Sequence, residues 1–103
     1  MDKKVIEIAS RYALEVKNLL PVKMVILYGS YARGTPTRSS DIDIAVVVDK
    51  FQGDYLKTSA DLFNLVRSLN KNIEPVLLSR RNDKSGFLES ILRYGKIVYK
   101  SEN

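Results

Sequence analysis

The chain has 103 residues, a length that fits one small domain with a modest hydrophobic core. It contains no cysteine and no histidine, which excludes disulfide bonds, thiolate or imidazole zinc sites, and catalysis by either residue type. Lysine and arginine outnumber aspartate and glutamate by 17 to 12, giving a net charge of +5 that favours anionic partners such as nucleotides, nucleic acids or acidic proteins.

The first part of the chain reads as a helix followed by a strand. Apolar residues from Val5 to Leu20 recur every three or four positions, which predicts an amphipathic helix that Pro21 ends. The segment from Val22 to Tyr28 is apolar apart from Lys23. A run of this length, stopped by Gly-Ser, predicts a strand that is covered on both faces.

The strand is followed by a stretch suited to binding phosphate. Gly29 allows a sharp exit from the strand, and its missing side chain lets an anion approach the main chain closely. Ser30 either caps a short helix that runs through Arg33 or offers its hydroxyl to the anion. Unpaired N–H groups at the start of this helix would face the ligand. Gly-Ser after a strand is also a common turn.

A pair of carboxylates precedes and enters the next strand, Ile42 to Val48. Because side chains alternate along a strand, Asp41 and Asp43 project on one face, and Ile42, Ile44, Val46 and Val48 project on the opposite face. Neighbouring like charges repel, and a divalent cation such as Mg²⁺ with a substrate phosphate relieves the repulsion. The structural alternative is a solvated strand edge or an Asx turn.

The remaining elements supply the scaffold. The pattern predicts a helix from Leu56 to Leu69, a strand from Ile73 to Leu78, a short helix from Phe87 to Leu92, and a last strand from Ile97 to Tyr99. The periodic apolar residues of the helices are expected in the core. Residues 1–103 therefore form one α/β domain with helices packed on a small sheet. With no signal peptide and no membrane-spanning segment, the chain is expected to be cytoplasmic.

Together, Gly29-Ser30, Arg33-Gly34 and Ser40-Asp41-Ile42-Asp43 resemble the signature of the minimal nucleotidyltransferases (MNT group) of the DNA polymerase β-like superfamily. The resemblance covers nearly the whole chain. It implies an α/β (α+β) core with a small mixed sheet of about four strands, in which the strand bearing the two aspartates lies next to the strand ending at Tyr28. It also implies that Gly29, Ser30, Arg33 and Ser40 bind the nucleotide, with the glycine and serine on the β- and γ-phosphates. Asp41 and Asp43 would hold Mg²⁺.

The family also implies a third carboxylate on a nearby strand that helps to activate the acceptor. Glu74 is the only acid within a later apolar strand segment, so we assign it as general base or third metal ligand. Pro75 removes a hydrogen-bond donor and indicates an edge strand or a bulge. The alternative for Glu74 is a solvent-facing acid at the start of the strand.

Other side chains near these segments have two interpretations each. Arg33 contacts phosphate or forms a structural ion pair, and Arg38 is a second candidate for the triphosphate. Tyr31 is a pocket wall or a packing residue rather than a chemical participant. The cluster Arg80, Arg81 and Lys84 is expected to be a solvated loop.

The resemblance points to Mg²⁺-dependent nucleotidyl transfer, most simply of AMP from ATP to an acceptor hydroxyl. It implies that the acceptor is a tyrosine of a small helical HEPN-domain toxin, for which this protein is the antitoxin. No acceptor-binding domain is recognisable in the sequence, so the acceptor surface would come from a partner. One alternative is an antitoxin that acts by occlusion without catalysis. Another is transfer to a small molecule or an RNA 3′ end, which the positive charge favours and the lack of aromatic–basic RNA motifs disfavours.

Overall fold

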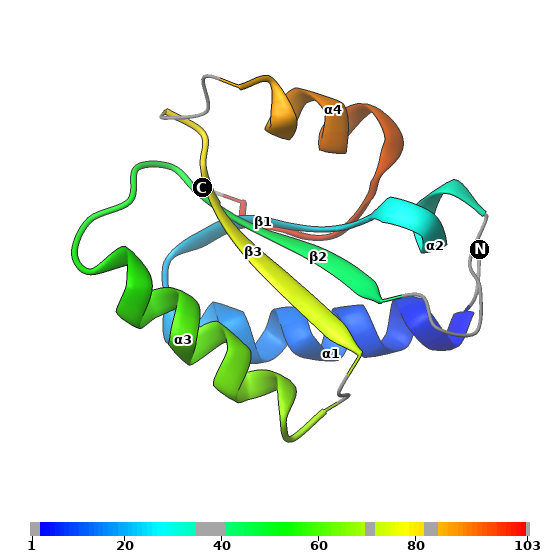
Figure 1. Ribbon diagram of the computed structural model, residues 1–103, viewed down its shortest axis with the longest axis horizontal. Helices are drawn as coiled ribbons and strands as arrows, with labels where there is room; N and C mark the ends of the chain where they lie inside the picture. Colours follow the sequence, from blue (N-terminus) through cyan, green and yellow to red (C-terminus); the bar gives the residue numbers. More distant parts are fainter. Residues whose placement is uncertain (1–2, 35–40, 70–71, 82–84, 103) are drawn as a thin grey trace.

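The computed structural model describes residues 3–34, 41–69, 72–81 and 85–102. Its elements follow in the predicted order of helices and strands (Figure 1). They are α1 (Lys3–Leu19), β1 (Val22–Tyr28), α2 (Gly29–Arg33), β2 (Ile42–Val48), α3 (Tyr55–Val66), β3 (Ile73–Ser79), α4 (Phe87–Tyr94) and β4 (Lys96–Lys100). None of the helices in these ranges combines the length and the apolar character needed to cross a membrane.

The four strands form one mixed sheet in the order β3-β2-β1-β4. β1 is antiparallel to both β2 and β4, whereas β2 and β3 are parallel and are joined by the crossover helix α3. The predicted mixed sheet of about four strands is confirmed, and so is the position of β2 beside β1. β3 and β4 are the two edge strands, which agrees with the presence of Pro75 in β3.

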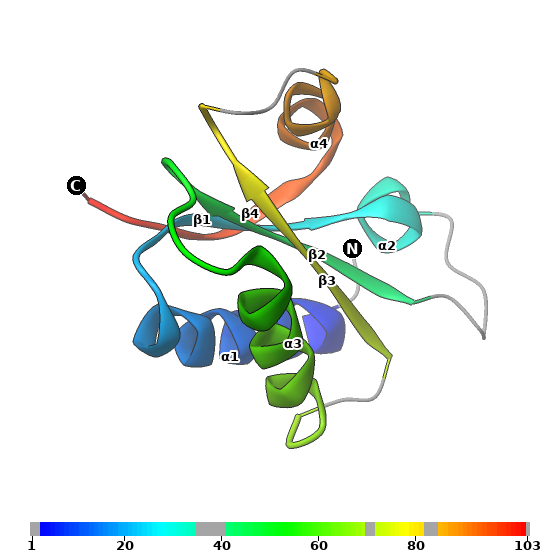
Figure 2. The ribbon, with the colours of Figure 1, turned by 60° about the vertical axis from the view of Figure 1, so that its left-hand side comes forward.

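Helices cover both faces of the sheet. α1 and α3 lie on one face and α4 on the other, while α2 follows directly from the end of β1 (Figures 1 and 2). The alternation along β2 divides its side chains between two cores: Ile44 and Val46 pack with α1 and α3, whereas Ala45 and Val47 pack with Leu88 of α4. Asp43 has the same parity as Ala45, so its side chain projects on the α4 face of the sheet.

Two tyrosine hydroxyls connect α3 to α1 and to the sheet. The hydroxyl of Tyr12 in α1 donates to the main-chain oxygen of Leu62 in α3 at 2.7 Å, and this contact is buried. The hydroxyl of Tyr55 donates to the main-chain oxygen of Leu77 in β3 at 2.8 Å. The bond of Tyr12 satisfies polar groups that burial would otherwise penalise, and the two bonds together connect α3 to α1 and to β3.

Two expectations for α3 were wrong. The helix ends at Val66 rather than at Leu69. Leu56 and Phe63, which the periodicity placed in the core, are 79% and 50% exposed. Only one stripe of a helix packed on a flat sheet can be buried, and in α3 that stripe is formed by Leu62 and Val66.

Candidate functional site

Three polar side chains stand in a row across three neighbouring strands. Tyr28 at the end of β1 pairs with Asp43 in β2, and Asp43 pairs with Glu74 in β3. Residues paired directly across strands project from the same face with neighbouring Cβ atoms, so the three side chains line up on the α4 face. The β2–β3 register is continuous from Ile42 to Val48, so β3 carries Pro75 as an edge strand without a bulge.

The register brings the predicted carboxylates together. Asp41 directly precedes β2 and is exposed, Asp43 is half-buried, and Glu74 is exposed at the start of the edge strand. The pKa of Asp43 is raised, first by burial and then by the negative charges of Glu74 and Asp41. Glu74 and Asp41 therefore lie close enough to Asp43 to disfavour its ionised form.

Tyr28 takes part in the same electrostatic group. Its pKa is raised to about 12 by burial and then by the charges of Asp43 and Glu74. The phenol is therefore protonated at neutral pH and can donate a hydrogen bond beside the carboxylates. Tyr28 cannot be recognised as a site residue from the sequence, because only the pairing of β1 with β2 shows that it stands next to an aspartate.

Gly29 brings the phosphate-loop segment and the aspartate pair into contact. Its φ is +75°, a backbone conformation that residues with a side chain rarely adopt. A Cβ placed on Gly29 would collide with Oδ2 of Asp43 and would lie 3.0 Å from its Cγ. The carboxylate of Asp43 thus lies against the main chain of Gly29. A glycine is needed at this position because of its positive φ and because a Cβ would overlap this carboxylate.

The predicted capping role of Ser30 was wrong. α2 begins at Gly29, its N-cap residue is Tyr28, and no side chain there makes a capping hydrogen bond. The helix starts one residue earlier than the cap prediction required, so Ser30 lies inside its first turn. Ser30 is half-buried, and its second predicted role, contact of the hydroxyl with an anion, stays a prediction.

Of the two predicted roles of Arg33, no structural ion pair is seen with the described residues, and contact with phosphate stays a prediction. Its guanidinium carbon lies over the ring of Tyr94 in α4, 5.7 Å from the ring centroid, in a cation–π contact. Tyr31 packs against the core that contains α1 and β1, in agreement with the packing interpretation. The candidates Ser40 and Arg38 lie outside the described residues.

A pocket of about 210 Å³ adjoins this site between α2 and α4. We call it the α2–α4 pocket. An edge-to-face contact between Tyr28 and Phe87, with ring centroids 5.8 Å apart, forms one of its walls. The residues that line it are Tyr28, Gly29, Arg33, Phe87, Ser90, Ile91 and Tyr94. The sequence analysis did not identify the contribution of Ser90 and Tyr94, because α4 reaches the site only through the tertiary fold.

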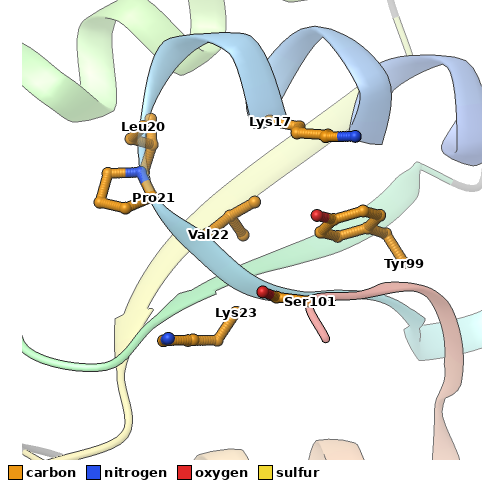
Figure 3. Close-up of a pocket in the computed structure, with 7 residues that line it drawn as sticks. All are labelled: Lys17, Leu20, Pro21, Val22, Lys23, Tyr99 and Ser101. Atoms are coloured by element: carbon orange, nitrogen blue, oxygen red, sulfur yellow. The ribbon is translucent and has the colours of Figure 1, made fainter. Parts of the chain in front are cut away.

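A second cavity of similar volume, about 210 Å³, lies between α1 and the end of β4. Figure 3 shows Lys17 above it and the hydroxyl groups of Tyr99 and Ser101 pointing into it. The ammonium of Lys17 lies 5.7 Å from the centroid of the Tyr99 ring. This cavity opens at Val22, the start of β1, whereas the carboxylates stand beside its end. The two cavities have the same volume, but only the α2–α4 pocket adjoins the carboxylates.

The basic cluster at the other end of β2 has a structural partner. Arg80 Nη2 and Arg81 Nε contact the two carboxylate oxygens of Asp49 at 2.8 and 2.9 Å. Both arginines are exposed, as predicted, but they are paired rather than simply solvated. The hydrogen bond from Arg80 is the main cause that lowers the pKa of Asp49, followed in effect by both positive charges. Lys84, the third member of the predicted cluster, lies outside the described residues.

The acids do not form a complete metal cage by themselves. Within residues 3–34, 41–69, 72–81 and 85–102, no three acidic side chains converge in a geometry ready to hold a metal ion. Asp41, Asp43 and Glu74 lie at the same end of β2 and β3, but an ion there would need ligands beyond these three side chains. Mg²⁺ sites in nucleotide enzymes commonly have this composition, with one or two carboxylates completed by substrate phosphates.

Comparison with known proteins also indicates a nucleotide-transferring enzyme. The family described as "Polymerase beta, Nucleotidyltransferase" matches residues 3–103. A Methanocaldococcus jannaschii protein named "Putative protein adenylyltransferase MJ0604" is 34% identical over 89 residues, which cover 84% of this chain and 88% of that protein.

Two solved structures are similar in fold. One is a toxin–antitoxin crystal structure with AMP-PNP, with a TM-score of 0.69 and 24% identity over 90% of this chain and 74% of that one. The other contains a tri-AMPylated Shewanella oneidensis HEPN toxin in complex with an MNT antitoxin, with a TM-score of 0.64 and 19% identity over 93% of this chain and 73% of that one. With the family match over nearly the whole chain, the protein belongs to the polymerase beta nucleotidyltransferase family of enzymes.

Proposed function

We propose that this protein is a Mg²⁺-dependent adenylyltransferase that moves AMP from ATP to a hydroxyl group of a partner protein, a tyrosine of a HEPN-type toxin, and thereby acts as its antitoxin. The proposal rests on one observation. Asp43 in β2 pairs with Glu74 in β3, and its carboxylate lies against the main chain of Gly29. The name of the M. jannaschii relative and the contents of the two similar structures support the choice of reaction and partner.

The residues present fit a divalent cation. Asp41, Asp43 and Glu74 supply the hard oxygen ligands that Mg²⁺ prefers, and their mutual repulsion, expressed in the raised pKa of Asp43, is relieved by a positive ion. When bound, Mg²⁺ supplies charge neutralisation at the transferring phosphate and lowers the pKa of the attacking hydroxyl.

The reaction is a displacement at the α-phosphorus. A bond forms between the acceptor oxygen and the α-phosphorus while the bond to the oxygen bridging the α- and β-phosphates breaks, so pyrophosphate leaves. Glu74 accepts the proton of the acceptor hydroxyl. Gly29 gives the phosphates access to the main chain, and Ser30, Arg33 and Ser40 bind them. Rate acceleration then comes from positioning and charge stabilisation.

The acceptor side of this site is accessible. Glu74 is exposed on the edge strand β3, and Asp41 is exposed before β2, so a hydroxyl on the surface of another protein can approach without any rearrangement of the sheet. Residues 1–103 act as one minimal catalytic domain in this proposal, and the partner supplies the surface around the acceptor.

The test is AMP transfer to the candidate toxin in the presence of ATP and Mg²⁺, followed by intact-mass measurement. We expect Asp43→Asn and Glu74→Gln to lower the initial rate by about 100-fold or more, since each removes a group that acts on the reacting atoms. Asp61→Asn is the matched control, because Asp61 is an acid on α3 that forms an ion pair with its helical neighbour Lys57. An unmodified partner with the wild-type protein, or equal rates in Asp43→Asn and wild type, would contradict the proposal.

A growth assay separates catalysis from occlusion. Co-expression of the toxin with the double variant Asp41→Asn/Asp43→Asn is expected to leave the toxin active. Full neutralisation by this variant, at matched protein levels, would instead assign the antitoxin activity to binding alone.

A further inference from the structure

We propose that α4 forms the second wall of the phosphate site, and that the α2–α4 pocket holds the terminal phosphates of the donor nucleotide and then the pyrophosphate product. In this arrangement Ser90 contacts the phosphate and Tyr94 positions Arg33 toward it. The inference rests on the proposed function, which it deepens by adding residues of α4 to the nucleotide site.

The polar groups of the pocket, which lie among the aromatic rings of Tyr28, Phe87 and Tyr94, favour an anion. The guanidinium of Arg33 and the hydroxyls of Tyr28 and Ser90 can each donate a hydrogen bond to a ligand in the pocket, whereas Tyr94 contributes its ring. Among the described residues that line it, no acid and no carboxamide is present, so the only charge is positive. A ligand rich in acceptor oxygens and negative charge, such as a phosphate group, matches this set of donors.

The position of the pocket relative to the acids matches the leaving group. The cross-strand row runs from Glu74 through Asp43 to Tyr28, and the pocket begins at Tyr28 and Gly29. In a displacement at phosphorus, the attacking and leaving oxygens lie roughly in line on opposite sides of the phosphorus. With the acceptor at Glu74 and the reacting phosphate beside Asp43, the pyrophosphate departs toward the pocket.

The contact between Arg33 and Tyr94 gives the arginine a defined position. Arg33 is the last residue of a five-residue helix and its side chain is exposed, so without a partner it would lose much conformational entropy on binding an anion. The ring of Tyr94, which also lines the pocket, restrains the guanidinium, whose central carbon lies 5.7 Å from the ring centroid. Tyr94 is therefore a positioning residue, and its effect on phosphate binding passes through Arg33.

The experiment measures binding of two probes to the full chain by isothermal titration calorimetry with Mg²⁺. Inorganic tripolyphosphate represents the phosphate tail, and AMP represents the nucleoside with the α-phosphate. Tyr94→Leu removes the ring, Tyr94→Phe keeps it, and Ser90→Ala removes the hydroxyl. Tyr99→Leu is the control, because it removes the equivalent cation–π contact with Lys17 in the distant cavity.

We expect tripolyphosphate affinity to fall about 2- to 5-fold in Tyr94→Leu and about tenfold in Ser90→Ala. Tyr94→Phe and Tyr99→Leu should bind it like wild type, and AMP affinity should stay unchanged in all four variants. Unchanged tripolyphosphate affinity in both Tyr94→Leu and Ser90→Ala would overturn the proposal. A selective loss of AMP affinity would also overturn it, because the pocket would then hold the nucleobase. Neither probe requires an acceptor, so these results are independent of whether the toxin is modified.

Discussion

Replacing Gly29 with alanine tests the contact between the phosphate-loop segment and the aspartate pair. Two separate effects follow from the structure. The first is the backbone conformation, since φ at Gly29 is +75° and an L-residue in this region costs about 1–2 kcal/mol. The second is the overlap of the new Cβ with the carboxylate of Asp43, which forces that side chain to move.

Gly34 provides a control for the first effect alone. Its φ is also +75°, and a Cβ placed there meets no atom within 4 Å. Gly29→Ala and Gly34→Ala should therefore share the backbone cost of about 1–2 kcal/mol, which corresponds to a fall in melting temperature of about 4–8 °C per kcal/mol for a domain of this size. Only Gly29→Ala displaces Asp43, and a displacement of about 1 Å at a reacting group lowers the rate by about 100-fold.

The assay compares thermal unfolding and AMP transfer in the two variants. We expect similar losses of stability and a transfer rate that falls about 100-fold in Gly29→Ala, while Gly34→Ala stays close to wild type. The reasoning would be refuted by Gly29→Ala transferring AMP as fast as Gly34→Ala. It would also be refuted by an equally large loss of activity in Gly34→Ala with its fold intact.

The remaining predictions concern stability and are measured by urea or thermal unfolding. Tyr12→Phe should lower the free energy of unfolding by about 1 kcal/mol, because it removes a buried hydrogen bond between α1 and α3. Leu62→Ala should lower the free energy of unfolding by about 2–5 kcal/mol, whereas Leu56→Ala should change it by no more than about 0.5 kcal/mol. The reason is that the Leu62 side chain is 1% exposed and the Leu56 side chain is 79% exposed. Equal losses of stability in the two variants would refute the assignment of the buried stripe of α3. Asp49→Asn should destabilise the protein at neutral pH, with the difference from wild type disappearing as the pH falls below 3.8 through the lowered pKa of the folded state; a difference that persists in acid would contradict the ion-pair explanation.

The order of elements was predictable from local patterns. The apolar run of β1, the helical period of α1 and the terminating Pro21 depend on residues close in sequence, and the structure confirms each element in place. The exposure of Leu56 was not predictable, because α3 is apolar on more than one side and only its packing partner decides which side is buried.

The candidate site also has residues that were predictable from the sequence and residues that only the tertiary structure places there. Gly29, Ser30, Asp41 and Asp43 were identified from motif chemistry and spacing, and the structure gathers Gly29 and both aspartates at one end of β1 and β2. Glu74 was chosen by elimination, and only the parallel register of β2 and β3 places it beside Asp43. The catalytic roles of these residues stay predictions, which the transfer assays test.

By itself, the sequence determined which residues could bind phosphate and metal and which segments form helices and strands, because both depend on residue type and short spacing. Only the tertiary structure decided which side chains stand together. Strand register places Tyr28 and Glu74 on either side of Asp43, and the packing of α4 brings Ser90 and Tyr94 to the pocket beside Gly29. The physical reason is that strand pairing and helix packing join segments distant in sequence. A one-residue shift in strand register would turn Tyr28 or Glu74 to the other face of the sheet.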